Sequence, residues 1–148
     1  MTRRPPRRAL VILALGAALA AGACSPAAPT SAPAASMPAG AVAALPAEVS
    51  AADAQALRDD GAFILDVRQP DEWATVHIPD ATLIPLGELE SRLAEVPRDR
   101  QVVVVCRSGN RSAQGRDILL GAGFPSVTSM AGGMNDWAAA GYPTASGS

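Results

Sequence analysis

The chain has 148 residues, a formal charge of −2 and a mean hydropathy of +0.17. Hydrophobic residues make up 49% of it, which is enough for a packed core and argues against wholesale disorder. All 12 cationic residues are arginines; from Cys24 onward, 8 arginines stand against 14 acidic residues, a charge of −6. This balance argues against a nucleic-acid partner, and 2 cysteines with 1 histidine offer no Cys/His zinc cluster. We therefore expect no metal and no cofactor.

The first 23 residues have the pattern of a signal peptide. Four arginines within residues 3–8 precede an uncharged apolar run at 9–21, which is too short to span a bilayer. Small residues then lead to Cys24, an arrangement that resembles a bacterial lipoprotein signal, although Ala21 stands where Leu is usual. The alternative is an ordinary signal peptide cut at the same bond, which leaves Cys24 as a plain thiol. We expect an exported protein that a lipid on Cys24 anchors to the cell membrane, on its outer or periplasmic side.

Residues 24–46 are expected to form a disordered tether. They are rich in Ala, Pro, Ser and Thr, carry no charge and show neither a helical nor a strand period. Such a segment cannot bury enough apolar surface to offset the entropy of ordering it. We therefore expect one folded domain, over residues 47–145.

Within this domain, turn residues alternate with short apolar segments. Ser50 and Asp53 have the spacing of a helix capping box, and Gly61 stands where a helix commonly ends. The four valines of Val102–Val105 are typical of a strand buried on both faces in a parallel sheet. In chain order the expected elements are a helix at 51–60, strands at 62–67 and 82–85, a helix at 86–94, a strand at 101–105, a helix at 112–120, a strand at 127–130 and a helix around 134–138. This alternation predicts an α/β domain with helices on both faces of a mainly parallel sheet.

Cys106 is the candidate nucleophile. It directly follows the four valines, which places a thiol at the carboxyl end of a central strand, where ligands bind in open α/β sheets. A helix begins after the loop, so free N–H groups and the helix dipole face the sulfur, and Arg107 and Arg111 add positive charge. Such features can lower a cysteine pKa to as little as ~3.5–7.5. Gly109 lets successive amides converge on one point, which makes a cradle for a small oxyanion.

The other interpretation of Cys106 is a buried cysteine that serves as a small hydrophobic side chain. That role does not need two arginines, a glycine and an asparagine directly after it. An exported protein also normally pairs its cysteines. If Cys24 is lipidated, Cys106 has no partner, and an unpaired thiol in that setting suggests reactivity. We therefore favour a functional thiol.

Four short motifs are spread over the domain in register, and together they resemble a known family. They are Leu65-Asp66-Val67-Arg68 followed by Glu72-Trp73, then His77-Ile78-Pro79-Asp80-Ala81, then Cys106 to Ser112, and then Gly132-Gly133-Met134-Asn135-Asp136-Trp137. Their order and spacing, from about Glu48 to Thr144, resemble the single-domain rhodaneses, a family of sulfurtransferases. Val76 and Asp80 depart from the family, which usually has glycine at both positions. The resemblance implies a three-layer α/β fold around a mainly parallel, five-stranded sheet.

The resemblance also implies a mechanism of the thiosulfate sulfurtransferase type. The Cys106 thiolate takes the outer sulfur of a donor such as thiosulfate, releases sulfite and becomes a persulfide, which cyanide, a thiol or a protein acceptor then discharges. Asp66 and Arg68 would support the site structurally. The substrate would be held by the loop residues Arg107, Ser108, Gly109, Asn110, Arg111 and Ser112.

Two other functions compete with this interpretation. Tyrosine-phosphatase-type loops place five residues between cysteine and arginine, whereas four lie between Cys106 and Arg111, and the smaller ring should suit sulfur better than phosphate or arsenate. A small-oxyanion enzyme on the same fold is therefore the weaker alternative. The second is a non-catalytic rhodanese-like module that carries sulfur or binds a partner. Glu72 and His77 are expected to have local hydrogen-bonding roles.

Overall fold

The computed structural model describes residues 43–147, which contain a five-stranded parallel sheet. The strands are β1 (Glu48–Val49), β2 (Phe63–Asp66), β3 (Thr82–Leu83), β4 (Val102–Val105) and β5 (Val127–Met130), in the spatial order β1-β5-β4-β2-β3. All neighbouring strands run parallel, with Phe63 opposite Val102 and Val102 opposite Val127. β4 is the central strand and all four of its valines are buried. The predicted α/β fold is confirmed.

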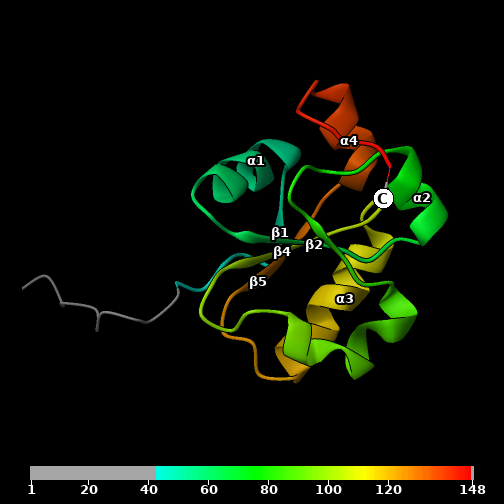
Figure 1. Cartoon of the computed structure of the whole chain (residues 1–148). Coiled ribbons are helices and arrows are strands. Elements are labelled where there is room, and N and C mark those ends of the chain that lie inside the picture. Colours follow the sequence, from blue (N-terminus) through cyan, green and yellow to red (C-terminus); the bar gives the residue numbers. More distant parts are fainter. Residues whose placement is uncertain (1–42, 148) are drawn as a thin grey trace, which may run out of the picture. The chain divides into compact units, whose positions relative to one another are not determined.

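Helices cover both faces of this sheet (Figure 1). They are α1 (Ala51–Asp59), α2 (Pro70–Thr75), α3 (Asn110–Gly121) and α4 (Gly133–Ala139). On the face of α1 and α4, the fully buried Trp137 shares an apolar cluster with Val103 and Val105. On the face of α3, Leu119 shares a second cluster with Val102 and Val104. Alternate valines of β4 thus enter opposite clusters, as expected for a strand buried on both faces.

The capping box predicted for α1 is present. Ser50 Oγ accepts the N–H of Asp53 at 3.2 Å, and the Asp53 carboxylate accepts the N–H of Ser50 at 3.3 Å. The helix ends just before Gly61, whose φ of +91° lies in the region that favours glycine.

The segment predicted as an α-helix at 86–94 has a different structure. It forms two short 3-10 helices, η1 (Leu86–Ser91) and η2 (Leu93–Glu95). Its hydrogen bonds span three residues, such as the one from the N–H of Arg92 to the carbonyl of Leu89 at 3.1 Å. Proline at each end and Gly87 inside leave too short a run of helix formers to sustain an α-helix. The apolar spacing still buries Leu89.

Two elements have no counterpart in the sequence predictions. β1 has only two residues, so it shows no alternation that a pattern could reveal. α2 begins with Pro70, and the carboxylate of Glu72 accepts the N–H of Gln69 at 3.2 Å. Proline at the first helical position and an acidic residue two positions later are start signals that the sequence does contain.

Residues 1–42 lie outside the described part of the chain, so the signal peptide, the lipidation of Cys24 and the tether stay predictions. From Ala43 onward the chain contacts the domain, because the Ala43 carbonyl accepts the hydroxyl of Ser126 and the side-chain amide of Gln101. None of the helices between residues 43 and 147 is both long and apolar enough for a membrane crossing.

Candidate active site

Cys106 directly follows β4 and lies at the carboxyl ends of the parallel strands. The residue is 1% exposed and belongs to the apolar cluster under α3, which by itself would fit a small core side chain. Its sulfur has polar neighbours, however. Sγ accepts the N–H of Gly109 at 3.1 Å and lies 3.6 Å from the hydroxyl oxygen of Ser112. As a buried free thiol, Cys106 donates its S–H to Ser112 Oγ, whose own proton is donated to the Gly109 carbonyl. Once the thiol is ionised, the Ser112 hydroxyl can turn its proton to the sulfur.

These donors lower the pKa of Cys106. Burial raises the pKa of a thiol, because the thiolate loses its hydration. The hydroxyl of Ser112 and the backbone N–H groups of Ser112, Ser108 and Gly109 act in the opposite direction and outweigh burial. The pKa of Cys106 therefore lies below its ordinary value, and the loop favours the thiolate.

Gly109 gives the loop its tight curve. Its φ is +100°, in the left-handed region that favours glycine, and its carbonyl accepts the hydroxyl of Ser112 at 2.7 Å. α3 starts at Asn110, two residues before the predicted start, so its first turn is part of the loop. The free N–H groups of this helix end are thereby brought to the sulfur.

The start of α4 holds the outer side of the loop. The N–H of Met134 donates to the Cys106 carbonyl at 2.8 Å, and the N–H of Asn135 donates to the Arg107 carbonyl at 3.1 Å. In a trans peptide the N–H points opposite to the carbonyl, so an outward Arg107 carbonyl turns the N–H of Ser108 inward. A Cβ on Gly133 would overlap the Cys106 carbonyl oxygen, so only glycine allows α4 to approach this closely.

Arg111 is paired with α2. Its Nη1 and Nη2 lie 2.7 and 2.8 Å from the two carboxylate oxygens of Glu72. Mainly through these hydrogen bonds, Arg111 lowers the pKa of Glu72 to about 2, and the same pair raises the pKa of Arg111. The positive charge of Arg111 is thus shared with Glu72, and the groups that contact the sulfur directly are amides and a hydroxyl.

Asp66 and Arg68 form a buried ion pair beneath α2. Their side chains are 1% and 3% exposed, and Arg68 Nη2 lies 2.6 Å from the Asp66 carboxylate. Arg68 also donates to the carbonyls of Val76 at 2.7 Å and Glu72 at 3.4 Å. A continuous set of bonds therefore runs from the end of β2 through α2 to Arg111 and the loop.

The side chains of Arg107 and Asn110 are exposed, and the hydrogen bonds of the sulfur go to Gly109 and Ser112 instead. Among the described residues, Arg107 has no partner for its guanidinium, and it lines a cavity of about 450 Å³ between α2 and α4. His77 lies farther out, where its ring stacks on Trp73 at 3.9 Å and its Nδ1 lies 3.0 Å from the Trp73 carbonyl oxygen. Its backbone forms two hydrogen bonds with Ala145, so His77 fixes the C-terminal segment against α2.

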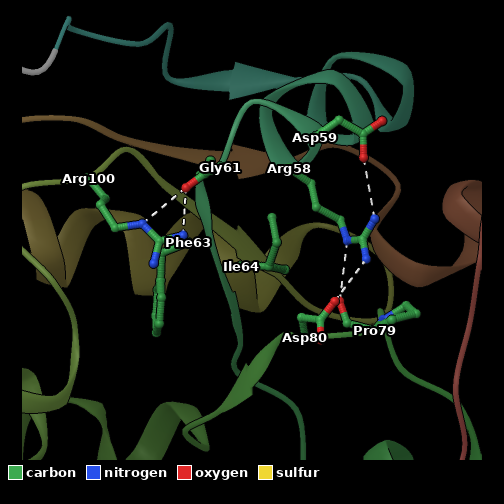
Figure 2. Close-up of a pocket in the computed structure, with 9 residues that line it drawn as sticks. Arg58, Asp59, Gly61, Phe63, Ile64, Pro79, Asp80 and Arg100 are labelled. Atoms are coloured by element: carbon green, nitrogen blue, oxygen red, sulfur yellow. Dashed lines mark hydrogen bonds and ion pairs between the residues drawn. The ribbon is translucent and has the colours of Figure 1, made fainter.

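Another cavity lies at the opposite, amino ends of the strands (Figure 2). It has a volume of about 490 Å³ and contains two arginines. Arg58 is engaged by the Pro79 carbonyl and by Asp80, both at 3.3 Å, and Arg100 donates to the Gly61 carbonyl at 2.6 and 3.0 Å. These arginines hold loops at the amino ends of the strands, whereas Cys106 follows the carboxyl end of β4. Over residues 43–147, no group of three or more His, Cys, Asp and Glu side chains is placed to hold a metal ion.

Comparisons with known proteins identify the family. The family model described as a rhodanese-like domain matches residues 50–140. A sulfurtransferase of Allochromatium vinosum is 41% identical over 81 residues, covering 55% of this chain and 76% of that protein. Thiosulfate sulfurtransferase GlpE of Pseudomonas syringae pv. syringae is 39% identical over 84 residues, covering 57% and 79%. The crystal structure of a rhodanese-related protein from Thermoplasma volcanium matches with a TM-score of 0.62 and 32% identity, covering 66% of this chain and 96% of that one. The chain belongs to the rhodanese-like sulfurtransferase family.

Proposed function

We propose that this protein is a thiosulfate sulfurtransferase that works through a persulfide on Cys106. The observation that carries the proposal is the position of the Cys106 sulfur, 3.1 Å from the backbone nitrogen of Gly109 and 3.6 Å from the hydroxyl oxygen of Ser112, in a loop that lowers its pKa. A thiolate held in this way is a nucleophile that needs no general base. The name of the relative from Pseudomonas syringae supports thiosulfate as the donor.

The reaction has two steps. The Cys106 thiolate attacks the outer sulfur of thiosulfate; a sulfur–sulfur bond forms to Cys106, and the bond to the SO₃ group breaks, so that sulfite leaves with the electron pair. An acceptor such as cyanide or a thiol then attacks the outer sulfur of the persulfide, and Cys106 leaves as a thiolate. Both steps are displacements at sulfur, so no external oxidant or reductant is needed.

The loop amides serve both steps. They surround the thiolate in the free enzyme, and the same N–H groups would hold the negative outer sulfur of the persulfide. Because they are fixed by α4 and by the first turn of α3, they need no reorganisation during the transfer. Arg107 is exposed at the edge of the loop, where its positive charge would attract anionic donors.

The cellular location is part of the proposal. The basic and apolar residues before Cys24 favour export and a lipid anchor on that cysteine. The mass of the N-terminal peptide of the native protein tests this directly. A diacylglyceryl group on Cys24 would support the anchor, and a Cys24 without lipid would leave only a signal-peptide cut.

The decisive experiment is the intact mass of the purified domain after incubation with thiosulfate. We expect the mass to rise by one sulfur atom, to return to its original value on adding cyanide, and to stay unchanged in Cys106→Ser. A folded wild-type domain that gains no sulfur would contradict the proposal and favour a binding module. Phosphatase turnover above the rate of sulfur transfer would favour the small-oxyanion alternative.

A further inference from the structure

We propose that the cavity between α2 and α4 is the acceptor subsite of the enzyme, and that it takes an organic thiol bearing a carboxylate. The proposal rests on the sulfurtransferase function proposed above. We call the cavity the α2–α4 groove; it is lined by Glu72, Val76, Arg107, Met134, Asn135 and Ala138, together with Arg68 and Thr75.

The groove lies directly against the catalytic loop. Met134 and Asn135, in one wall, donate their N–H groups to the carbonyls of Cys106 and Arg107 at 2.8 and 3.1 Å. In the opposite wall, Glu72 is bonded to Arg111 near the other end of the loop. Of the loop residues, Arg107 lines the groove and Cys106 does not, so a molecule seated there lies beside the loop and must extend past Arg107 to reach the sulfur.

The groove is open to solvent and is large enough for an organic ligand. Its volume is about 450 Å³, and a water molecule takes up about 30 Å³ of the liquid. Sites for organic ligands typically measure about 300–1,000 Å³.

The charges in the groove favour an anion. Arg68 is neutralised by Asp66, and Glu72 is neutralised by Arg111. Among the described residues, this leaves Arg107 as the lining cation without a partner. An Arg fork binds a carboxylate with two hydrogen bonds.

The rest of the wall suits the body of an organic thiol. Val76 and Ala138 present apolar surface from the end of α2 and from α4, and the buried Met134, 4% exposed, contributes little to it. A thiol whose carboxylate meets Arg107 could lay its carbon chain on this surface and present its sulfur to Cys106. In the transfer, the acceptor sulfur bonds to the outer sulfur of the persulfide, the bond to Cys106 breaks, and the acceptor's proton ends on the transferred sulfur or in solvent.

The test uses the full domain loaded as the persulfide, so that only the acceptor step is followed. Discharge is measured with cyanide, with 3-mercaptopropionate and with its methyl ester, the two thiols being compared at equal thiolate concentration. Ala138→Trp should fill the groove, whereas Ala139→Trp changes an equally exposed neighbour on the same helix that does not line it.

We expect Ala138→Trp to slow discharge by the carboxylate thiol by about 10-fold or more, while discharge by cyanide stays unchanged. Ala139→Trp should change neither rate. Wild type should prefer the acid to its ester, and Arg107→Gln should remove that preference, which keeps the test valid if the tryptophan variant fails to fold.

The outcomes separate the two proposals. If wild type forms no persulfide, the sulfurtransferase function fails and the subsite fails with it. If the persulfide forms but Ala138→Trp slows cyanide and thiol equally, or acid and ester react alike in wild type, the function stands and the acceptor subsite is overturned.

Discussion

Glu72 and Arg111 are 39 positions apart in the chain, and two short hydrogen bonds of 2.7 and 2.8 Å join their side chains. The pair connects α2 to the first turn of α3, which forms part of the loop from Cys106 to Ser112. Arg68, which is paired with Asp66, donates a hydrogen bond to the Val76 carbonyl at the end of α2. The position of the loop therefore depends on a helix that carries none of the groups that contact the sulfur.

The first prediction concerns this ion pair. Glu72→Gln keeps the size of the side chain but removes its charge, so Arg111 is held less firmly. We expect the rate of persulfide formation to fall by about 10-fold, which corresponds to ~1.4 kcal/mol. Glu90→Gln, an exposed acid outside the ion pairs of the described residues, is the matched control. An unchanged rate in a folded Glu72→Gln variant would show that the pair does not position the loop.

The same pair predicts a pH dependence of stability. Arg111 lowers the pKa of Glu72 from 4.5 to about 2 in the folded protein, and this effect is absent in the unfolded chain. The stabilisation is therefore fully present above about pH 4.5 and is lost as the pH falls toward 2. In urea unfolding, the free energy of unfolding of wild type should exceed that of Glu72→Gln by a larger amount at pH 6 than at pH 3. An equal difference at both pH values would contradict this.

Two adjacent glycines provide the next prediction. Gly132 and Gly133 have φ values of +66° and +57°, so the left-handed backbone alone should cost alanine at either position about 1–2 kcal/mol of stability. A Cβ on Gly132 meets the flexible, exposed side chain of Asp136, whereas a Cβ on Gly133 meets the backbone of Cys106 and Arg107.

Activity should separate the two variants. Gly133→Ala should lose about 100-fold in sulfur transfer, because a shift of roughly 1 Å in the loop misplaces its donors. Gly132→Ala should keep most of its activity. Steady-state kinetics of the two purified variants measure this difference, and circular dichroism confirms that both are folded. Equal activities would show that the close contact of α4 with the Cys106 backbone does not position the loop.

Asp80 is the only non-glycine residue in the described region with a positive φ, at +65°. Its carboxylate is 93% exposed and pairs with Arg58, a contact worth at most ~1 kcal/mol (Figure 2). Asp80→Gly should therefore change the free energy of unfolding by less than about 1 kcal/mol. Asp80→Val loses the same ion pair but adds strain, and should be less stable than the glycine variant by about 1–2 kcal/mol. If the glycine and valine variants are equally stable in thermal unfolding, the positive φ at position 80 does not strain a non-glycine residue.

Local patterns in the sequence were sufficient for much of this structure. The buried valines of β4 and the capping box at Ser50 are signals contained within a few residues, and the structure has both. The same reasoning failed at 86–94, because leucine spacing records which side of a segment is buried and does not distinguish an α-helix from 3-10 turns. The short β1 has no pattern to read.

The candidate site could be predicted only in part. The loop from Cys106 to Ser112 is continuous in sequence, so its amides and its glycine could be recognised as an anion cradle. The pairing of Arg111 with Glu72 and the contact of Gly133 with Cys106 join distant segments. Nothing in one sequence specifies such partners, because they follow from the way the sheet brings α2 and α4 to the loop.

The central claim is that the loop holds Cys106 as a thiolate, and the ultraviolet absorbance of the thiolate as a function of pH tests it most directly. With Cys106→Ser as the blank, the sulfur should titrate below the ordinary value of 9.0, because the Ser112 hydroxyl and the loop amides outweigh burial. Ser112→Ala, which removes the hydroxyl and keeps the amide, should move the midpoint upward. A wild-type midpoint at or above 9.0 would contradict the account, since burial would then dominate and Cys106 would be a core thiol.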